Sequence, residues 1–381
     1  MYFTDTGGIS IHIPTYIIEI ILSSIWSFCI ICALLVAIFP EYFQFVSQHG
    51  KRLINNSIYN NSNSNSNSNS NTYTTNVYTL SYTLESFMNW KVSKSYFKYM
   101  YLIGCICTCL LLTISINRNQ HQNENENTNN TNTLMNHGNL ILICFLIHCF
   151  RRLLECIYIT IVNDSKMHIS GLLVGILHYI CTPLTLYSSQ SLIIAKFSVV
   201  LIDITSFGSI ILTIWRFLLL VGFVYCNYAQ FRCHYILYRM KLKQSDGDGR
   251  DPARSGRIDR SGRTDRTDID SKRYKLPKGY LFNYTACPHY FIEMFLYIIL
   301  LLIIITNYIY TYYCIIEIEN SSNTPNTNSI HTIHIQSILP MILCTCWVIT
   351  NLTAVAIDNY HWYEQHFKIP PNWTVVIPFV W

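Results

Sequence analysis

Long apolar runs alternate with polar tracts along this chain. A helix crosses about 30 Å of hydrocarbon in about 20 residues, because it rises 1.5 Å per residue. Runs of that length lie at residues 15–39, 98–117, 140–162, 169–187, 206–226, 291–315 and 336–357. A shorter apolar segment, 191–202, contains Lys196 and ends at Asp203, which favours an interfacial piece or the beginning of the fifth span. The pattern therefore predicts an all-α integral membrane protein with a bundle of seven spans, with six or eight as alternatives.

Composition supports the membrane prediction. The chain is 51% hydrophobic and only 12% charged, whereas a soluble domain usually has about 25% charged residues. Most cysteines lie inside the apolar runs, as Cys105, Cys107 and Cys109 do. Residues two apart on a helix point to different faces, so these cysteines make a poor metal site. We expect them to be small packing residues, and we expect no metal.

Basic residues predict the orientation in the membrane. The loops that hold nearly all the loop Lys and Arg are 40–97, 164–168 and 227–290. The opposite loops, 118–139, 188–205 and 316–335, contain only Arg118 and Lys196. Because basic loops stay in the cytosol, the N-terminus is predicted outside or in a lumen and the C-terminus in the cytosol. The net charge of +5 is then a signal of topology, and we expect no nucleic-acid partner.

Three polar tracts interrupt the apolar pattern. Two are rich in Asn, "NNSNSNSNSNSNTYTTN" from Asn60, which alternates Asn with Ser, and "NQHQNENENTNNTNT" from Asn119. The third, 245–272, alternates Arg with Asp among glycines and is predicted to be a disordered insertion. We therefore divide the chain into an N-terminal region, 1–139, with two spans and Asn/Ser-rich loops, and a C-terminal region, 140–381.

The third apolar run contains a polar stripe. In "LIHCFRRLLECIYITIV", residues 146–162, His148, Arg152 and Glu155 stand at i, i+4 and i+7 and share one helix face. Each charge inside a membrane costs about 2.5–3.5 kcal/mol on insertion scales, so these groups must face a polar cavity or one another. Arg152 and Glu155 are three apart and can pair. The stripe predicts an intramembrane functional site; an ion pair that only locks helices together is the alternative.

Further polar clusters follow in the C-terminal region. In "NYTACPHYFIEMF", 283–295, Pro288 suits a first helical turn, and His289 and Glu293 then share a face. A helix start also favours anions such as phosphate. "QFRCHYILYRMK", 230–241, is a basic and aromatic segment after the fifth span, where an anchor is the simpler interpretation. No glycine-rich dinucleotide loop follows a strand, so the residues alone fit either an enzyme or a seven-span small-molecule transporter.

The motifs resemble those of the steroid 5α-reductase family. They are "HCFRRLLECIYI", "QFRCHYILYRMK", "RYKLPKGYLFNYTACPHYFIEMFLY" and "HWYEQHFKIPPNWTVVIPFVW", in this order. The His-x-x-Arg-Arg-Leu-x-Glu-Cys and Cys-Pro-His-Tyr runs are most similar to the polyprenol reductase branch. The resemblance covers most of 140–381 apart from the insertion, whereas the first 139 residues agree only in hydropathy.

This resemblance implies a multi-pass enzyme of the endoplasmic reticulum membrane with its C-terminus in the cytosol. It would use NADPH to reduce the α-isoprene double bond of a long-chain polyprenol, giving the dolichol used in protein N-glycosylation. Hydride adds readily to an alkene only if a neighbouring carbonyl takes up the charge. We therefore hypothesise that the aldehyde, polyprenal, is the species reduced. A 3-oxo-5α-steroid 4-dehydrogenase acting on enone steroids is the alternative within the family.

The resemblance also implies site residues. The positions that match the family's cofactor-binding residues are Gln230, His234, Tyr274, His289, Glu293, Asn351 and Tyr363. Our candidates for the catalytic polar end are His148, Arg152 and Glu155. Two positions depart from the family pattern: His361 and Trp373 stand where the family usually has basic residues. These departures put the details of phosphate contact in doubt.

Overall fold

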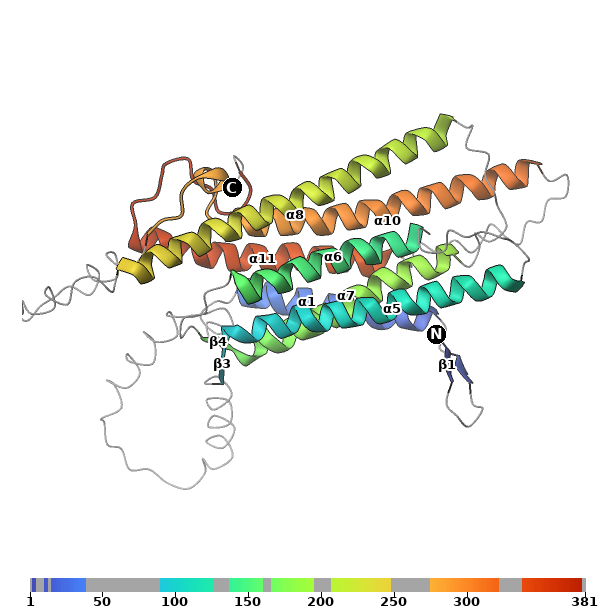
Figure 1. Cartoon of the computed structure of the whole chain (residues 1–381), viewed down its shortest axis with the longest axis horizontal. Coiled ribbons are helices and arrows are strands. Elements are labelled where there is room, and N and C mark those ends of the chain that lie inside the picture. The colour runs from blue at the N-terminus through green and yellow to red at the C-terminus, as the bar shows by residue number, and fades with distance from the viewer. Residues whose placement is uncertain are drawn as a thin grey trace, which may run out of the picture.

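The chain folds as a bundle of long helices (Figure 1). The computed structural model describes residues 2–4, 10–12, 15–38, 90–125, 137–159, 166–194, 207–247, 275–321 and 338–378. The helices are α1 (Thr15–Ile38), α5 (Phe97–Asn125), α6 (His137–Tyr158), α7 (Ile169–Ile194), α8 (Phe207–Gly247), α10 (Pro288–Ser321) and α11 (Leu339–His366). Each predicted apolar run corresponds to one of these helices, and the parts of the runs at 39, 160–162, 206 and 336–337 lie outside the described residues.

Six of these helices, α1, α5, α7, α8, α10 and α11, are long and apolar enough to cross a membrane. Helix α6 has 22 residues, but Arg151, Arg152 and Glu155 lower its hydropathy, and it completes the bundle as the seventh. The predicted all-α multi-pass membrane fold is therefore confirmed. One boundary was wrong: the fifth span was expected to end at 226, but α8 continues as one helix to Gly247. The segment 195–206 lies outside the described residues.

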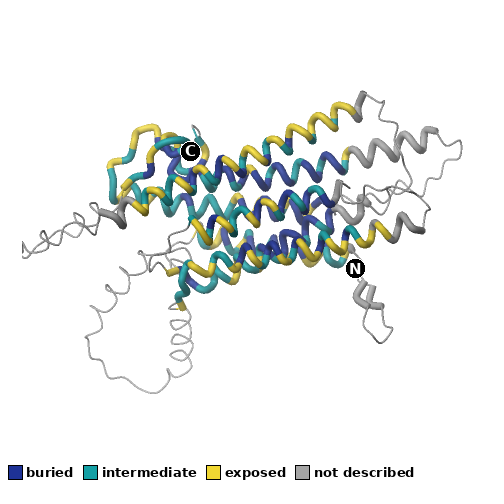
Figure 2. The backbone as a smooth tube through the Cα atoms, in the orientation of Figure 1, coloured by how far each residue is buried: buried dark blue, intermediate teal, exposed yellow. Residues whose placement is uncertain are grey.

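Burial separates an apolar exterior from a packed interior. Along α8, large apolar side chains such as Phe217, Val221 and Val224 are exposed on the outer face, and Figure 2 shows exposed positions following the outside of this helix. A contiguous apolar surface of this kind suits lipid rather than water. The described cysteines are free thiols, as expected for packing residues.

Close helix contacts shape the interior. Helix α8 packs along α10, α1 along α11, and α5 against both α6 and α7. At Gly104 of α5 an added Cβ would lie 2.9 Å from Cδ1 of Tyr179 on α7. Only glycine therefore lets Tyr179 approach α5 this closely. Pro183 lies inside α7 and removes the helical hydrogen bond to the carbonyl of Tyr179.

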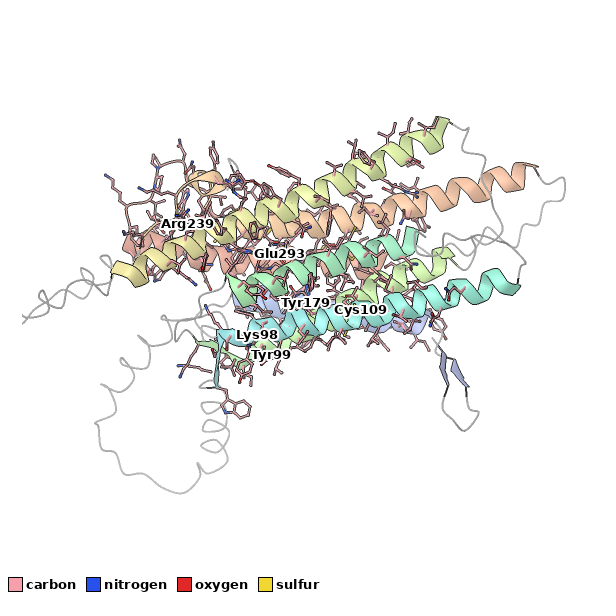
Figure 3. The ribbon with its side chains drawn as sticks, in the orientation of Figure 1. Lys98, Tyr99, Cys109, Tyr179, Arg239 and Glu293 are labelled. Atoms are coloured by element: carbon pink, nitrogen blue, oxygen red, sulfur yellow. The ribbon has the colours of Figure 1, made fainter. Side chains whose placement is uncertain are left out.

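The two ends of the bundle differ in charge. The N- and C-termini lie at opposite ends (Figure 1). At the C-terminal end, the short strands β3 (Lys91–Ser93) and β4 (Lys166–His168) pair antiparallel before α5 and α7. The described basic residues near this end are Lys91, Lys94, Lys98, Lys166, Arg239, Lys241, Lys275, Lys278 and Lys368, and Figure 3 shows Lys98 and Arg239 there. We name this end the basic end. A second short pair, β1 (Tyr2–Thr4) and β2 (Ser10–His12), lies at the opposite end.

The C-terminal segment folds back over the start of α10. Among the described residues, the 3-10 helices are η1 (Lys94–Tyr96) and η4 (Tyr280–Asn283). Helix η4 precedes α10 and follows Gly279, whose φ of 94° suits glycine. Trp373 is 5% exposed, and its indole nitrogen donates to the carbonyl of Phe282 at 2.6 Å. The amide of Ala286 donates to the carbonyl of Thr374 at 2.9 Å. Trp373, which departs from the family pattern, therefore joins the segment after α11 to the residues that precede α10.

Candidate functional site

Polar side chains from α6, α8 and α10 meet inside the bundle toward the basic end. His148 is 2% exposed, Glu155 3% and Gln230 0%. Figure 3 shows Glu293 in the interior, between α10 and α6. The predicted stripe thus faces inward, as the cost of charge in lipid requires.

Glu155 lies at the centre of this network. Its carboxylate accepts hydrogen bonds from Arg151 and Arg152 on its own helix. Nδ1 of His234, on α8, lies 2.7 Å from its Oε2. The pairing of Arg152 with Glu155, expected from their spacing, is confirmed. The interaction therefore also ties α6 to α8, which the sequence spacing did not show.

Arg152 extends the network to α5. Its Nε and Nη2 donate to the hydroxyl of Tyr101 at 3.2 and 2.8 Å, and its guanidinium lies 5.0 Å from the centre of the Tyr101 ring. Tyr101 is 8% exposed. Sequence reasoning missed it, because no local spacing relates residue 101 to residue 152.

Arg151 connects α6 to the other side of the site. Its Nε donates to Oδ1 of Asn227 at 2.9 Å, and its Nη2 donates to the side chain of Gln230. Gln230 in turn donates to the carboxylate of Glu293 and to the carbonyl of His289. Neither Arg151 nor Asn227 was among the predicted site residues. A continuous α8 would have revealed Asn227, since residues 227, 230 and 234 then share one face.

Two histidines in the site retain buried nitrogens without hydrogen bonds among the described residues. They are Nε2 of His148 and Nδ1 of His289. The first lies 3.6 Å from Oε1 of Glu293, within ion-pair range. The ring of His289 stands 5.4 Å from the ring of His234, edge to face. Because unsatisfied buried polar atoms are rare in native proteins, these nitrogens mark where a polar ligand can bind.

The remaining predicted residues lie elsewhere. Asn351 is half-buried on α11. Tyr363 packs in a separate apolar cluster, with its ring centre 5.4 Å from that of Trp373. Tyr274 falls outside the described residues. The structure thus brings together His148, Arg152, Glu155, Gln230, His234, His289 and Glu293.

The network balances its charges. Arg151 and Arg152 face Glu155 and Glu293, so two formal positive charges meet two negative ones. Pairing of this kind makes buried charge tolerable. Among the described residues, no group of three or more His, Cys, Asp or Glu side chains is arranged to hold a metal ion. The site suits a neutral polar group with both donors and acceptors better than a bare charge.

The sequence of this chain is similar to those of known proteins. The family model described as 3-oxo-5-alpha-steroid 4-dehydrogenase matches residues 255–333. Polyprenal reductase 2 of Oryza sativa subsp. japonica is 24% identical over 253 residues, which cover 61% of this chain and 56% of that protein. Polyprenal reductase of Caenorhabditis elegans is 24% identical over 235 residues, with 61% and 58% covered. Polyprenal reductase of Xenopus laevis is 26% identical over 153 residues, 40% of each chain.

The chain spans somewhat more than half the length of the Oryza and nematode relatives. Identity is modest, but these plant, nematode and amphibian relatives are all named polyprenal reductases. The chain is thus similar to the steroid 5α-reductase family, and polyprenal reductases are among its relatives.

Proposed function

We propose that this protein reduces the α-isoprene double bond of a long-chain polyprenal with NADPH, on the route to dolichol for protein N-glycosylation. The observation that carries the proposal is the buried, charge-balanced network of α6, α8 and α10, with its two unpartnered histidine nitrogens. The names of the relatives support the choice of an aldehyde substrate. The apolar exterior suits the bundle to the membrane, in which a long-chain isoprenoid also dissolves.

On the cofactor side, the proposed contacts are Gln230, His234, His289 and Glu293, together with Tyr274, Asn351 and Tyr363, which match the family's cofactor-binding positions. The bound cofactor supplies a hydride. The amide of Gln230, the carboxylate of Glu293 and Nδ1 of His289 fit a carboxamide and its ribose, which both donate and accept hydrogen bonds. Lysines of the basic end, among them Lys241 and Lys278, provide positive charge for the phosphates.

On the substrate side, hydride adds to C3 of the enal and the C2–C3 π electrons move toward the aldehyde oxygen. A buried hydrogen-bond donor stabilises that oxygen, and a proton then adds to C2 to give the saturated aldehyde. His148 is our candidate to touch the substrate, because its Nε2 has no hydrogen bond among the described residues. Arg152 and Glu155 hold the surrounding network in place and are proposed as positioning residues.

The proposed location is the endoplasmic reticulum membrane, with the basic end in the cytosol. The clustering of lysines and arginines at one end of the bundle supports this orientation. NADPH would then reach the site from the cytosol. Accessibility of Lys275 and Lys278 to a membrane-impermeant reagent in sealed vesicles tests the orientation.

Purified protein in detergent tests the activity. NADPH oxidation is measured with polyprenal, polyprenol or an enone steroid, because the family model's description keeps the steroid as a competitor. We expect rapid turnover of polyprenal only. Equal rates with polyprenol and polyprenal would contradict the proposal, and turnover of the steroid alone would favour the steroid enzyme. Glu155→Gln should abolish turnover, whereas Glu364→Gln, an exposed carboxylate on α11, is the matched control.

A further inference from the structure

A second polar pair lies outside the charged network. Nε2 of His178, on α7, stands 2.7 Å from the hydroxyl oxygen of Tyr297, on α10. Tyr297 is 1% exposed. Tyr297 is the last residue of the motif 273–297, but neither residue was a predicted site residue, and the charged network does not use them.

The pair lies one helical turn deeper than Glu293. Tyr297 follows Glu293 by four residues, so both side chains lie on one face of α10, about 5.4 Å apart along its axis. His178 interacts electrostatically with Glu293 and His148. The ring of Trp26 stands 5.6 Å from His178, edge to face. The rings of Trp26, Tyr179 and Tyr297 therefore surround His178, one turn from Glu293.

The hydrogen bond to Tyr297 involves only one of the two ring nitrogens of His178. A tyrosine hydroxyl that donates to Nε2 of His178 fixes the proton of the neutral imidazole on Nδ1. Nδ1 of His178 is buried and has no hydrogen-bond partner among the described residues. A donor left unsatisfied in an apolar interior costs about 1–3 kcal/mol. A ligand that brings an acceptor oxygen would remove this cost.

We infer that the His178–Tyr297 pair binds the oxygen of the isoprenoid aldehyde, with Nδ1–H of His178 as the donor. This inference rests on the proposed function. It places the carbonyl one turn deeper than the charged network, beside the face of α10 that carries both Glu293 and Tyr297. As the two electrons of the C2–C3 double bond shift, the charge develops on the oxygen held by His178. His148 and His178 then flank the same turn of α10 and act as two donors to one oxygen.

The competing explanation is a structural tie, in which the pair only joins α7 to α10. Two amide substitutions separate the possibilities. His178→Asn keeps a donor near the place of Nδ1 and loses the bond to Tyr297. His178→Gln reaches the place of Nε2 and keeps that bond, but removes the donor at Nδ1. A binding role therefore predicts that the Asn variant works better, and a structural role predicts the reverse.

The first measurement is steady-state kinetics of the full chain with polyprenal and NADPH. We expect His178→Gln to lower kcat/KM for polyprenal by about 100-fold, as loss of one oxyanion donor does, with NADPH affinity unchanged. His178→Asn should recover most of the loss. The same substitutions at His366, which stacks on Trp362 at the basic end, serve as controls. Equal activity of both His178 variants and the unchanged protein, or better activity of the Gln variant, would overturn the inference.

The second measurement needs no turnover. Infrared difference spectra of polyprenal with a ¹³C-labelled aldehyde report the hydrogen bond, because donation to the oxygen lowers the carbonyl frequency. We expect a lowered frequency in the unchanged protein and His178→Asn, and loss of the shift in His178→Gln. If both amide variants misfold, Tyr297→Phe is measured instead, and an unaltered carbonyl frequency there overturns the inference. A carbonyl shift without any NADPH oxidation would instead defeat the proposed function, so the two failures are distinguishable.

Discussion

Removing the negative charge of Glu155 is the sharpest test of the charged network. Glu155→Gln keeps the size of the side chain but leaves Arg151 and Arg152 facing Glu293 alone. The carboxylate is 3% exposed and also bonds His234, so water cannot take its place. Breaking a buried ion pair by removing one partner costs about 3–5 kcal/mol. We expect a loss of stability in this range.

Equilibrium unfolding in mixed detergent micelles measures the effect. Adding Arg151→Gln to Glu155→Gln returns the network to formal charge balance, with Arg152 facing Glu293. We expect this double variant to recover about 1–3 kcal/mol relative to the single one, because the two sites are directly coupled. Glu364→Gln, on the exposed end of α11, should change stability by less than about 0.5 kcal/mol. A double variant less stable than the single one would refute the idea that charge balance stabilises the site.

The other predictions concern the cofactor side and the C-terminus. His289→Ala and Glu293→Ala should each raise the Kd for NADPH measured by titration, while membrane insertion stays normal; unchanged Kd values would remove both from the site. Deleting 245–272 should leave kcat nearly intact, and loss of turnover would show that this insertion takes part in catalysis. Trp373→Phe should destabilise the protein by about 1–3 kcal/mol, because the carbonyl of Phe282 loses its buried donor; thermal unfolding equal to that of the unchanged protein would contradict this.

The helices follow from hydropathy because lipid imposes a strong constraint. Each span must satisfy its own backbone and present apolar side chains outward, so length and composition suffice to locate it. The end of α8 was misplaced for a related reason. Residues 227–241 are polar because one face of the helix points into the site and another lies at the basic end, and an averaged hydropathy cannot separate an inward face from a loop.

The candidate site was predictable only as far as helical spacing reaches. The shared face of His148, Arg152 and Glu155 follows from the 3.6-residue period, as does that of His289 and Glu293. Which faces meet depends on tertiary packing. Tyr101 and Asn227 come from other helices, and no pattern within either segment marks them as neighbours of α6. The same limit explains why the His178–Tyr297 pair emerged only from the structure.

The polar groups of the interior form two layers at different distances from the basic end, and the two layers suit different parts of the proposed reaction. Toward the basic end, four charged side chains are paired and their donors largely used. One turn deeper, His178 and Tyr297 bond to each other, and Nδ1 of His178 has no hydrogen-bond partner among the described residues. The phosphates of the proposed dinucleotide are best held beside the lysines of the basic end, and the proposed aldehyde beside the His178–Tyr297 pair among aromatic rings. Because an isolated donor strengthens as charge develops on its acceptor, the deeper layer is the better place for hydride addition, and the outer layer for fixing the dinucleotide.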